Sequence, residues 1–182
     1  MSRATRGLPP QERRYTSIDS PLGTLTLVAT AGVLSGLFMV DQRHRPPAEA
    51  FGAPDATPFS EVIEQLGEYF VGRRTAFELQ LAAVGTPFQL AVWEALRHIP
   101  YGERASYGQI AQRIGRPGAS RAVGLANGAN PIGIIVPCHR VVGSDGSLTG
   151  YGGGLERKRL LLELESVRSS SAWRSPSRSS TT

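Results

Sequence analysis

The feature that most constrains the fold is a change in hydrophobic period along the chain. Polar and apolar residues alternate with a period of two over residues 24–29, and turn residues separate this segment from strand-like segments at 15–18 and 33–40. Alternation of this kind predicts an antiparallel strand meander. Residues 59–71 instead place apolar side chains at helical spacing. The first half of the chain is therefore predicted to form a small sheet with one helix.

The second half begins at a change of composition near residues 82–85 and is predicted to be mostly helical. Two sequences have the form of a capping box, in which glutamine follows a hydroxyl residue by three positions: Thr86-Pro87-Phe88-Gln89 and Ser106-Tyr107-Gly108-Gln109. A turn at 115–118 follows the short helix that opens at Ser106, and another helix is expected from 119 to about 127. Two short helices joined by a glycine-containing turn are typical of a helix-turn-helix, although many enzymes use the arrangement as plain architecture.

Positive charge is concentrated around this predicted helix-turn-helix. Residues 97–140 hold six arginines and one acidic residue, whereas residues 15–96 hold four arginines and nine acidic residues. A basic stretch beside an acidic one indicates that only the second half meets a polyanion such as DNA. Ordinary solvated arginines are the alternative explanation, and Arg121, near the start of the later helix, favours DNA.

The single cysteine, Cys138, is the candidate reactive residue. It follows the apolar run 132–136 and lies between Pro137 and His139 in the basic part of the chain. Such surroundings are expected to favour the thiolate and so raise reactivity. A histidine can accept the thiol proton and a carboxylate can orient the histidine, but several carboxylates are available. The alternative is a small buried hydrophobic residue without chemistry.

Several classes of protein and site are not expected. No apolar run approaches the roughly 20 residues that a membrane span needs, and no signal-peptide pattern opens the chain, which predicts a soluble, cytoplasmic protein. One cysteine and three widely spaced histidines predict neither an internal disulfide nor a metal site.

The residues around Cys138 carry a specific resemblance to a known family. The motifs are Pro137-Cys138-His139-Arg140-Val141-Val142, the glycine-rich segment 150–154, residues 157–165, and upstream Ser106-Tyr107-Gly108-Gln109-Ile110-Ala111, Arg121-Ala122-Val123-Gly124 and Asn130-Pro131. Together they resemble the O6-alkylguanine-DNA alkyltransferases, densely over residues 86–166 and more loosely over 15–83. The proline-cysteine-histidine-arginine core is highly specific in this context.

The resemblance implies an α/β (α+β) fold of two domains. A ribonuclease-H-like antiparallel sheet with a helix would form an N-terminal structural domain over 15–83, and a mostly helical domain with a winged-helix-like helix-turn-helix would carry DNA binding and chemistry over 84–166. Residues 1–14 and the Ser/Arg-rich tail 167–182 are expected to be disordered, because their composition cannot form a core.

The implied activity is DNA repair by direct reversal. Cys138 would accept the alkyl group of O6-alkylguanine, with O4-alkylthymine as a further substrate. His139 would deprotonate Cys138 through a water, Glu165 would hold the correct tautomer of His139, and Asn130 would brace the turn that bears the cysteine. The thioether product has no hydrolytic route back to the thiol, so each molecule is expected to act once.

Further residues are implied at the DNA and at the base. Tyr107 and Lys158 would help the guanine leave, and Arg121 would enter the minor groove and fill the space of the flipped nucleotide, because sulfur cannot reach the O6 carbon inside the base stack. The other implied DNA contacts are Tyr107, Gly108, Arg116, Ser120, Gly124 and Ser144. The implied base pocket consists of Val141, Gly150, Tyr151 and Gly152, and Gly152 stands where vertebrate members carry serine.

The implied partner is double-stranded DNA containing O6-alkylguanine, bound by a monomer, with side-by-side assembly on DNA left open. No cofactor is implied, and the N-terminal cysteines with which some members bind zinc are lacking. Three other functions compete with this one. They are a lesion-binding relative without a reactive cysteine, which Cys138 argues against, a transcription regulator with the same helix-turn-helix, and a cysteine hydrolase built on Cys138 and His139.

Overall fold

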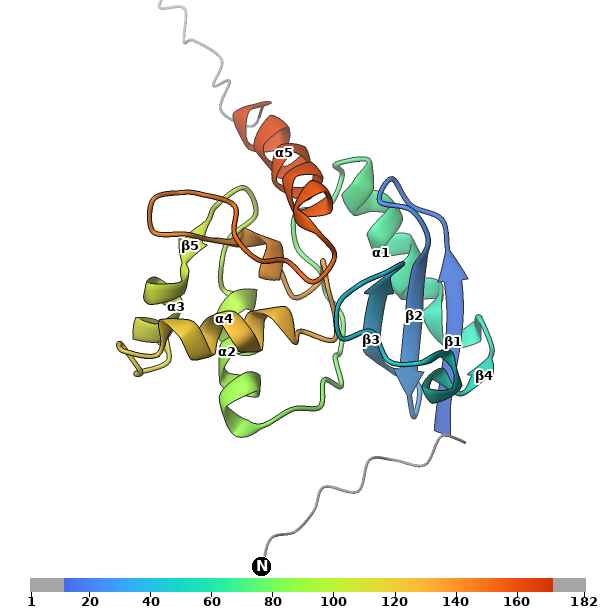
Figure 1. Ribbon diagram of the computed structural model, residues 1–182. Helices are drawn as coiled ribbons and strands as arrows, with labels where there is room; N and C mark the ends of the chain where they lie inside the picture. The colour runs from blue at the N-terminus through green and yellow to red at the C-terminus, as the bar shows by residue number, and fades with distance from the viewer. Residues whose placement is uncertain (1–11, 172–182) are drawn as a thin grey trace, which may run out of the picture.

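Residues 12–171 are described by the computed structural model, and they form a sheet-containing half and a helical half that lie side by side (Figure 1). The sheet has the strand order β3-β2-β1-β4, and its strands are β1 (Arg13–Ile18), β2 (Leu25–Thr30), β3 (Val33–Met39) and β4 (Ala53–Pro54). The pairs β1·β2 and β2·β3 are antiparallel, which confirms the predicted meander, while the short β4 runs parallel to β1.

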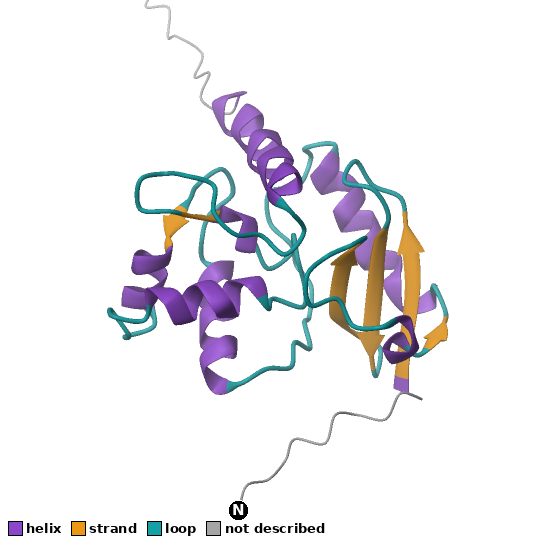
Figure 2. Cartoon of the chain, in the orientation of Figure 1, coloured by secondary structure: helices purple, strands orange, loops and turns teal. Residues whose placement is uncertain are grey.

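The central strand β2 is covered on both faces. Its residues Leu25 and Leu27 belong to the main core together with Leu66 of helix α1 (Ser60–Phe70), which lies against the sheet (Figure 2). On the other face Val28 packs with Phe38 in a smaller cluster that the 3-10 turn η2 (Ala48–Phe51) closes. Because both faces are buried, the sheet is more enclosed than simple alternation implies.

Both predicted capping boxes are formed in the helical half. Helix α2 (Pro87–Arg97) begins after Thr86 and helix α3 (Tyr107–Arg113) begins after Ser106, and in each case the hydroxyl accepts from the backbone of the glutamine three residues on. Helix α4 (Ser120–Gly128) completes the predicted helix-turn-helix, and the long helix α5 (Leu155–Ser171) is the last element of the described residues. The remaining elements are the 3-10 turns η3 (Thr57–Phe59) and η4 (Cys138–Arg140) and the short parallel pair β5 (Ala105–Ser106) and β6 (Val141–Val142).

Two expected boundaries differ from the structure. Strand β1 already begins at Arg13, which pairs with Thr30, so the ordered sheet starts inside the segment 1–14 that was predicted to be disordered. Helix α5 continues to Ser171, although the disordered tail was expected from 167, because no proline or glycine interrupts the helix there. Most of the two predicted tails, 1–11 and 172–182, lies outside the described residues.

The two halves share one hydrophobic core. Leu37 of β3 pairs with Ile132 of the segment before Cys138, and the Leu37 amide donates to the Pro131 carbonyl at 2.9 Å. Leu34, on the same strand, pairs with Leu81 of the linker between the halves. The sheet edge therefore supports the segment that carries the cysteine.

Candidate active site

Cys138 opens the 3-10 turn η4 at the end of a buried segment that two asparagines hold in place. The side-chain nitrogen Nδ2 of Asn130 donates to the Val136 carbonyl at 2.9 Å, and its side-chain oxygen Oδ1 accepts from the backbone N–H of Ile132 at 3.0 Å. Asn127, on α4, donates to the Cys138 carbonyl at 3.3 Å. Because these groups are buried, their hydrogen bonds fix the backbone on either side of the thiol.

His139 and Arg140 both bind the carboxylate of Glu165, which α5 places in the core. The distance from His139 Nε2 to Glu165 Oε1 is 2.7 Å, and Arg140 donates through Nη2 to Oε1 and through Nε to Oε2, each at 2.9 Å. His139 is fully buried and Glu165 is 1% exposed. These contacts hold the pKa of Glu165 at about 2 despite its burial, so the carboxylate is ionised and accepts the Nε2 proton.

Burial dominates the protonation of the two candidate reactive groups. It raises the pKa of the Cys138 thiol, although a hydrogen bond from Asn130 and the nearby charge of Lys158 oppose the change. Burial also lowers the pKa of His139 below its ordinary value of 6.5. The resting pair is therefore a thiol beside a neutral imidazole. The expectation that the surroundings favour a thiolate is wrong, because loss of solvent outweighs the nearby positive charge.

An open cavity of about 540 Å³ lies against the helix-turn-helix. It is lined by Arg43, His44, Tyr107, Ser120, Arg121, Gly124, Leu125, Gly128, Thr149, Gly150, Tyr151 and Gly152. A void of about 10 Å³ against Cys138 shares Gly128, Tyr151 and Gly152 with it. The cavity and the void are therefore neighbours, and Cys138, which is 5% exposed, lines the void but not the cavity.

Tyr107 and Lys158 hold the loop that forms one wall of this cavity. The Tyr107 hydroxyl donates to the Thr149 carbonyl at 3.0 Å. Lys158 is fully buried, and its Nζ donates to the carbonyls of Val141, Thr149 and Gly150 at 2.5, 2.8 and 3.4 Å. Burial lowers the pKa of Lys158 to about 8. The ammonium is thus engaged with backbone carbonyls beside the cavity.

The remaining residues expected from the sequence fall into two groups. Ser120, Arg121, Gly124, Gly150, Tyr151 and Gly152 all line the cavity together with Tyr107. Gly108, Arg116, Ser144 and Val141 do not. Arg116 and Ser144 are exposed on loops of the helical half, whereas Val141 is buried in β6 with its carbonyl bound to Lys158.

Sequence reasoning missed several residues of the site, Asn127 among them. Arg140 stands in the quoted motif without a role, yet it supplies two hydrogen bonds to Glu165. The hydroxyl of Tyr69, on α1, donates to Glu165, which is 96 residues away in the sequence. The helical spacing placed Tyr69 in the core, but no sequence pattern links it to Glu165. Arg43 and His44 come from the loop after β3, whose backbone binds Gly152, and only the fold brings that loop to the cavity.

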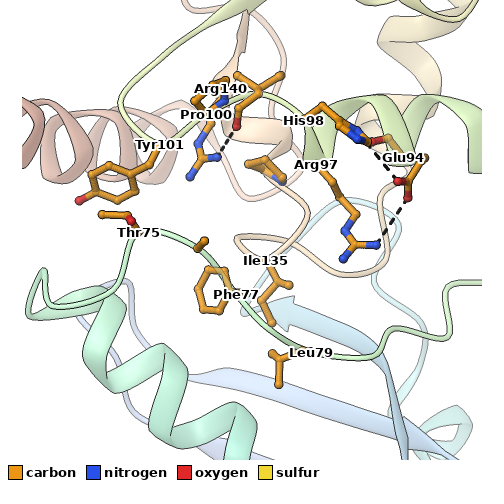
Figure 3. A pocket seen from close by; sticks show the side chains of 13 residues that line it. Thr75, Phe77, Leu79, Glu94, Arg97, His98, Pro100, Tyr101, Ile135 and Arg140 are labelled. Carbon is orange, nitrogen blue, oxygen red and sulfur yellow. Dashed lines mark hydrogen bonds and ion pairs between the residues drawn. The ribbon is translucent and has the colours of Figure 1, made fainter.

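A second cavity, of about 720 Å³, lies between the linker and the end of α2 (Figure 3). Polar side chains on its wall pair with one another, because Arg97 and His98 both point at Glu94. Arg140 borders it and donates to the Ile99 carbonyl at 2.7 Å. Cys138 does not line this cavity.

Neither a metal cluster nor a membrane helix is found within residues 12–171. No three His, Cys, Asp or Glu side chains of this range gather closely enough to hold a metal ion. In the same range no helix combines the length and the apolar character needed to cross a membrane.

A helix-turn-helix in the same domain as a buried cysteine, histidine and glutamate is typical of a DNA-binding protein with a nucleophilic centre. Two family models together match almost all of the described chain. They are the 6-O-methylguanine DNA methyltransferase ribonuclease-like domain, over residues 13–83, and the DNA-binding domain of the same family, over residues 87–167. The chain therefore belongs to the 6-O-methylguanine DNA methyltransferase family, and it is a methyltransferase of DNA repair.

The matches to known relatives extend over most of this chain and over most of each relative. A protein of Mycobacterium tuberculosis named methylated-DNA--protein-cysteine methyltransferase is 56% identical over 154 residues, which is 85% of this chain and 93% of the relative. A protein of the same name from Methanosarcina barkeri is 48% identical over 83% of this chain and 96% of its own. The crystal structure of Mycobacterium tuberculosis OGT in complex with DNA matches with a TM-score of 0.80 at 56% identity, over 85% of this chain and 94% of that one. This likeness confirms the α/β fold expected from the sequence.

Proposed function

We propose that this protein repairs DNA by transferring the alkyl group of O6-alkylguanine irreversibly to Cys138. The observation that carries the proposal is the position of the thiol. Cys138 lines a small void that shares three lining residues with a cavity bounded by the helix-turn-helix, and it precedes a histidine that Glu165 orients. The relatives' names and the complex of one relative with DNA support both the partner and the reaction.

The protonation states define the proposed chemistry. Nε2 of His139 carries the proton that binds Glu165, which leaves Nδ1 as the basic nitrogen, and Nδ1 is buried without a hydrogen-bond partner among the described residues. Nδ1 takes the thiol proton through a water as sulfur attacks the alkyl carbon. The new S–C bond forms while the C–O6 bond breaks, and the electron pair of that bond passes to the guanine.

Two residues are proposed to assist the leaving guanine. The Tyr107 hydroxyl lines the cavity beside the carbonyl of Thr149, and Lys158 lies behind the same loop. A hydrogen bond or proton from either group compensates the negative charge that develops on the base. In this arrangement Lys158 also orders the loop against which the base packs.

The substrate nucleotide must leave the duplex to reach the thiol, because Cys138 is almost completely buried. Arg121 is exposed at the start of α4 and lines the cavity, which suits it to fill the space that the flipped nucleotide vacates. Gly108, Arg116, Ser120, Gly124 and Ser144 are proposed to contact the DNA backbone around it. Val141 supports the base pocket through the loop held by Lys158, while Gly150, Tyr151 and Gly152 line it.

A thioether product makes the reaction stoichiometric. No water-driven step cleaves an S–alkyl bond as it would cleave a thioester, so one molecule repairs one lesion. O4-alkylthymine presents an equivalent alkyl oxygen and is proposed as a second substrate. The protein is proposed to act as a monomer, with the domain over 15–83 supporting the domain over 84–166.

Intact-protein mass spectrometry tests the proposal directly. The full chain is incubated with a duplex carrying one O6-methylguanine, and the product is mapped by peptide. We expect one added methyl on Cys138, stable to hydroxylamine and never exceeding one per molecule. The variant Cys138→Ala is the control and is expected to gain no mass. Tight lesion binding by the wild-type protein without any mass change would support a lesion-marking role instead.

A further inference from the structure

The carboxylate that orients His139 is also bound by a residue from the other half of the molecule. Tyr69, near the end of α1, donates its hydroxyl to Glu165 Oε1 at 2.8 Å. The same oxygen accepts from His139 Nε2 at 2.7 Å and from Arg140 Nη2 at 2.9 Å. Tyr69 is fully buried. The hydrogen bond therefore runs from the sheet-containing half directly into the candidate catalytic array.

Packing alone accounts for the ring of Tyr69 but not for its hydroxyl. The ring centroid lies 5.3 to 6.1 Å from those of Phe77, Phe70 and Tyr101. The Arg140 guanidinium lies 5.8 Å from the centroid of Tyr101, and both residues are visible at the wall of the second cavity (Figure 3). Phenylalanine would satisfy this aromatic cluster equally well. A buried hydroxyl aimed at a carboxylate oxygen has a separate electrostatic effect.

We propose that the Tyr69 hydroxyl is a positioning group for alkyl transfer, which fixes Glu165 and tunes the hydrogen bond between Glu165 and His139. This inference rests on the proposed function, since it assigns His139 as the base. It gives the N-terminal half a direct part in the chemistry through one hydrogen bond, in addition to its structural support.

The expected effect has a definite sign. Three donors share the negative charge of Glu165 Oε1, so each one weakens the attraction of that oxygen for the His139 proton. Without the Tyr69 hydroxyl, the carboxylate holds the imidazolium more strongly and the pKa of His139 rises. The other groups that face His139 are Arg140, Lys158 and Cys138, and the substitution leaves all of them in place.

The experiment compares Tyr69→Phe with the wild-type full chain. The rate constant for methyl transfer from a duplex carrying one O6-methylguanine is measured between pH 5 and pH 9 by quenching and intact mass. We expect the maximum rate to fall roughly threefold to tenfold, because the base is less well oriented. We expect the acid limb of the profile to move up by about half a pH unit, with unchanged affinity for undamaged DNA.

Tyr15→Phe is the matched control. It removes a tyrosine hydroxyl from the same half of the molecule, where Tyr15 packs against Phe51 and not against Glu165. Its pH profile is expected to coincide with that of the wild type. A double variant, Tyr69→Phe with Glu165→Gln, is expected to react at the rate of Glu165→Gln alone, because Tyr69 acts through Glu165.

Three results would overturn the inference. A Tyr69→Phe profile identical to the wild-type profile would do so. A rate loss that matches only the lost folded fraction, measured by circular dichroism, would show a purely structural role. Additive effects in the double variant would place Tyr69 outside the Glu165 pathway. In all three cases the wild type still takes up the methyl group, whereas no uptake by the wild type would refute the proposed function itself and this inference with it.

Discussion

Replacing Glu165 by glutamine removes one negative charge from a buried network and leaves its shape nearly unchanged. The carboxylate accepts hydrogen bonds from Tyr69, His139 and Arg140 and is 1% exposed. Glutamine resembles the protonated carboxyl group in size and charge. The variant therefore corresponds to wild-type protein in which this one residue is protonated.

The pKa of Glu165 sets the size of the effect. Although burial opposes it, hydrogen bonds from His139 and Arg140 together with the charge of Arg140 hold this pKa at about 2, against an ordinary value of 4.5. At 1.36 kcal/mol per pKa unit, the ionised group stabilises the fold by about 3 kcal/mol at pH 7. Removing one partner of a buried ion pair typically costs about 3–5 kcal/mol, which agrees. We expect Glu165→Gln to be less stable by about 3 kcal/mol at pH 7.

The sign of the pH dependence follows from the lowered pKa. Because the folded-state value lies below the unfolded one, the stabilisation is present above about pH 4.5 and is lost as the pH falls toward 2. The gap between wild type and Glu165→Gln should shrink from about 3 kcal/mol at pH 5 to about 1.4 kcal/mol at pH 3. Hydrogen bonds from Thr57 and Ser147 also lower the pKa values of Asp55 and Asp145. Both carboxylates occur in both proteins, so their contributions to the stability gap cancel.

Urea denaturation followed by circular dichroism, repeated from pH 7 to pH 3, measures this gap. Glu163→Gln is the matched control, because Glu163 lies two residues earlier on α5 with an exposed side chain. It should change the stability at pH 7 by less than about 0.5 kcal/mol. Parallel curves for wild type and Glu165→Gln, with a constant gap down to pH 3, would refute the assignment of a strongly lowered pKa.

Three further substitutions test the site. Cys138→Ala should keep its affinity for DNA in a mobility-shift assay and leave a methylated duplex unrepaired, and repair by this variant would contradict the mechanism. Arg121→Ala should reduce base flipping, followed by 2-aminopurine fluorescence, more than affinity for undamaged DNA, and unaltered duplex repair would refute its proposed role. Lys158→Met removes the donor to the carbonyls of Val141, Thr149 and Gly150. It should lower amide-exchange protection in the loop 143–150 by about tenfold or more, and unchanged protection would mean that other contacts hold this loop.

Local patterns in the sequence predicted most of the fold. The capping boxes at Thr86 and Ser106 formed as expected, because a cap depends on residues three positions apart. The meander was predictable for the same reason, since hairpin partners are near neighbours in sequence. The short strand β4 was not, because a two-residue strand that includes a proline has no period.

The site was less predictable because its contacts are distant in sequence. The residues alone left several carboxylates as partners for His139, and only the family resemblance singled out Glu165. Tyr69 occupied a helical core position, and its spacing does not reveal where its hydroxyl points. The protonation of Cys138 was predicted with the wrong sign, because sequence shows neighbouring charge but not burial.

The protonated resting state of Cys138 suits a residue that, in the proposed reaction, can be used only once. A thiolate would react with adventitious electrophiles and oxidants, and each such event would consume a molecule. Burial suppresses the thiolate, while the neutral imidazole of His139 stays available to accept the proton. Proton transfer creates a thiolate and an imidazolium, which Lys158 and Glu165 respectively stabilise from positions already fixed by hydrogen bonds. In the proposed reaction, reactivity is thereby confined to the moment when a flipped base fills the cavity, because only that base presents an alkyl carbon to the sulfur in the absence of bulk solvent.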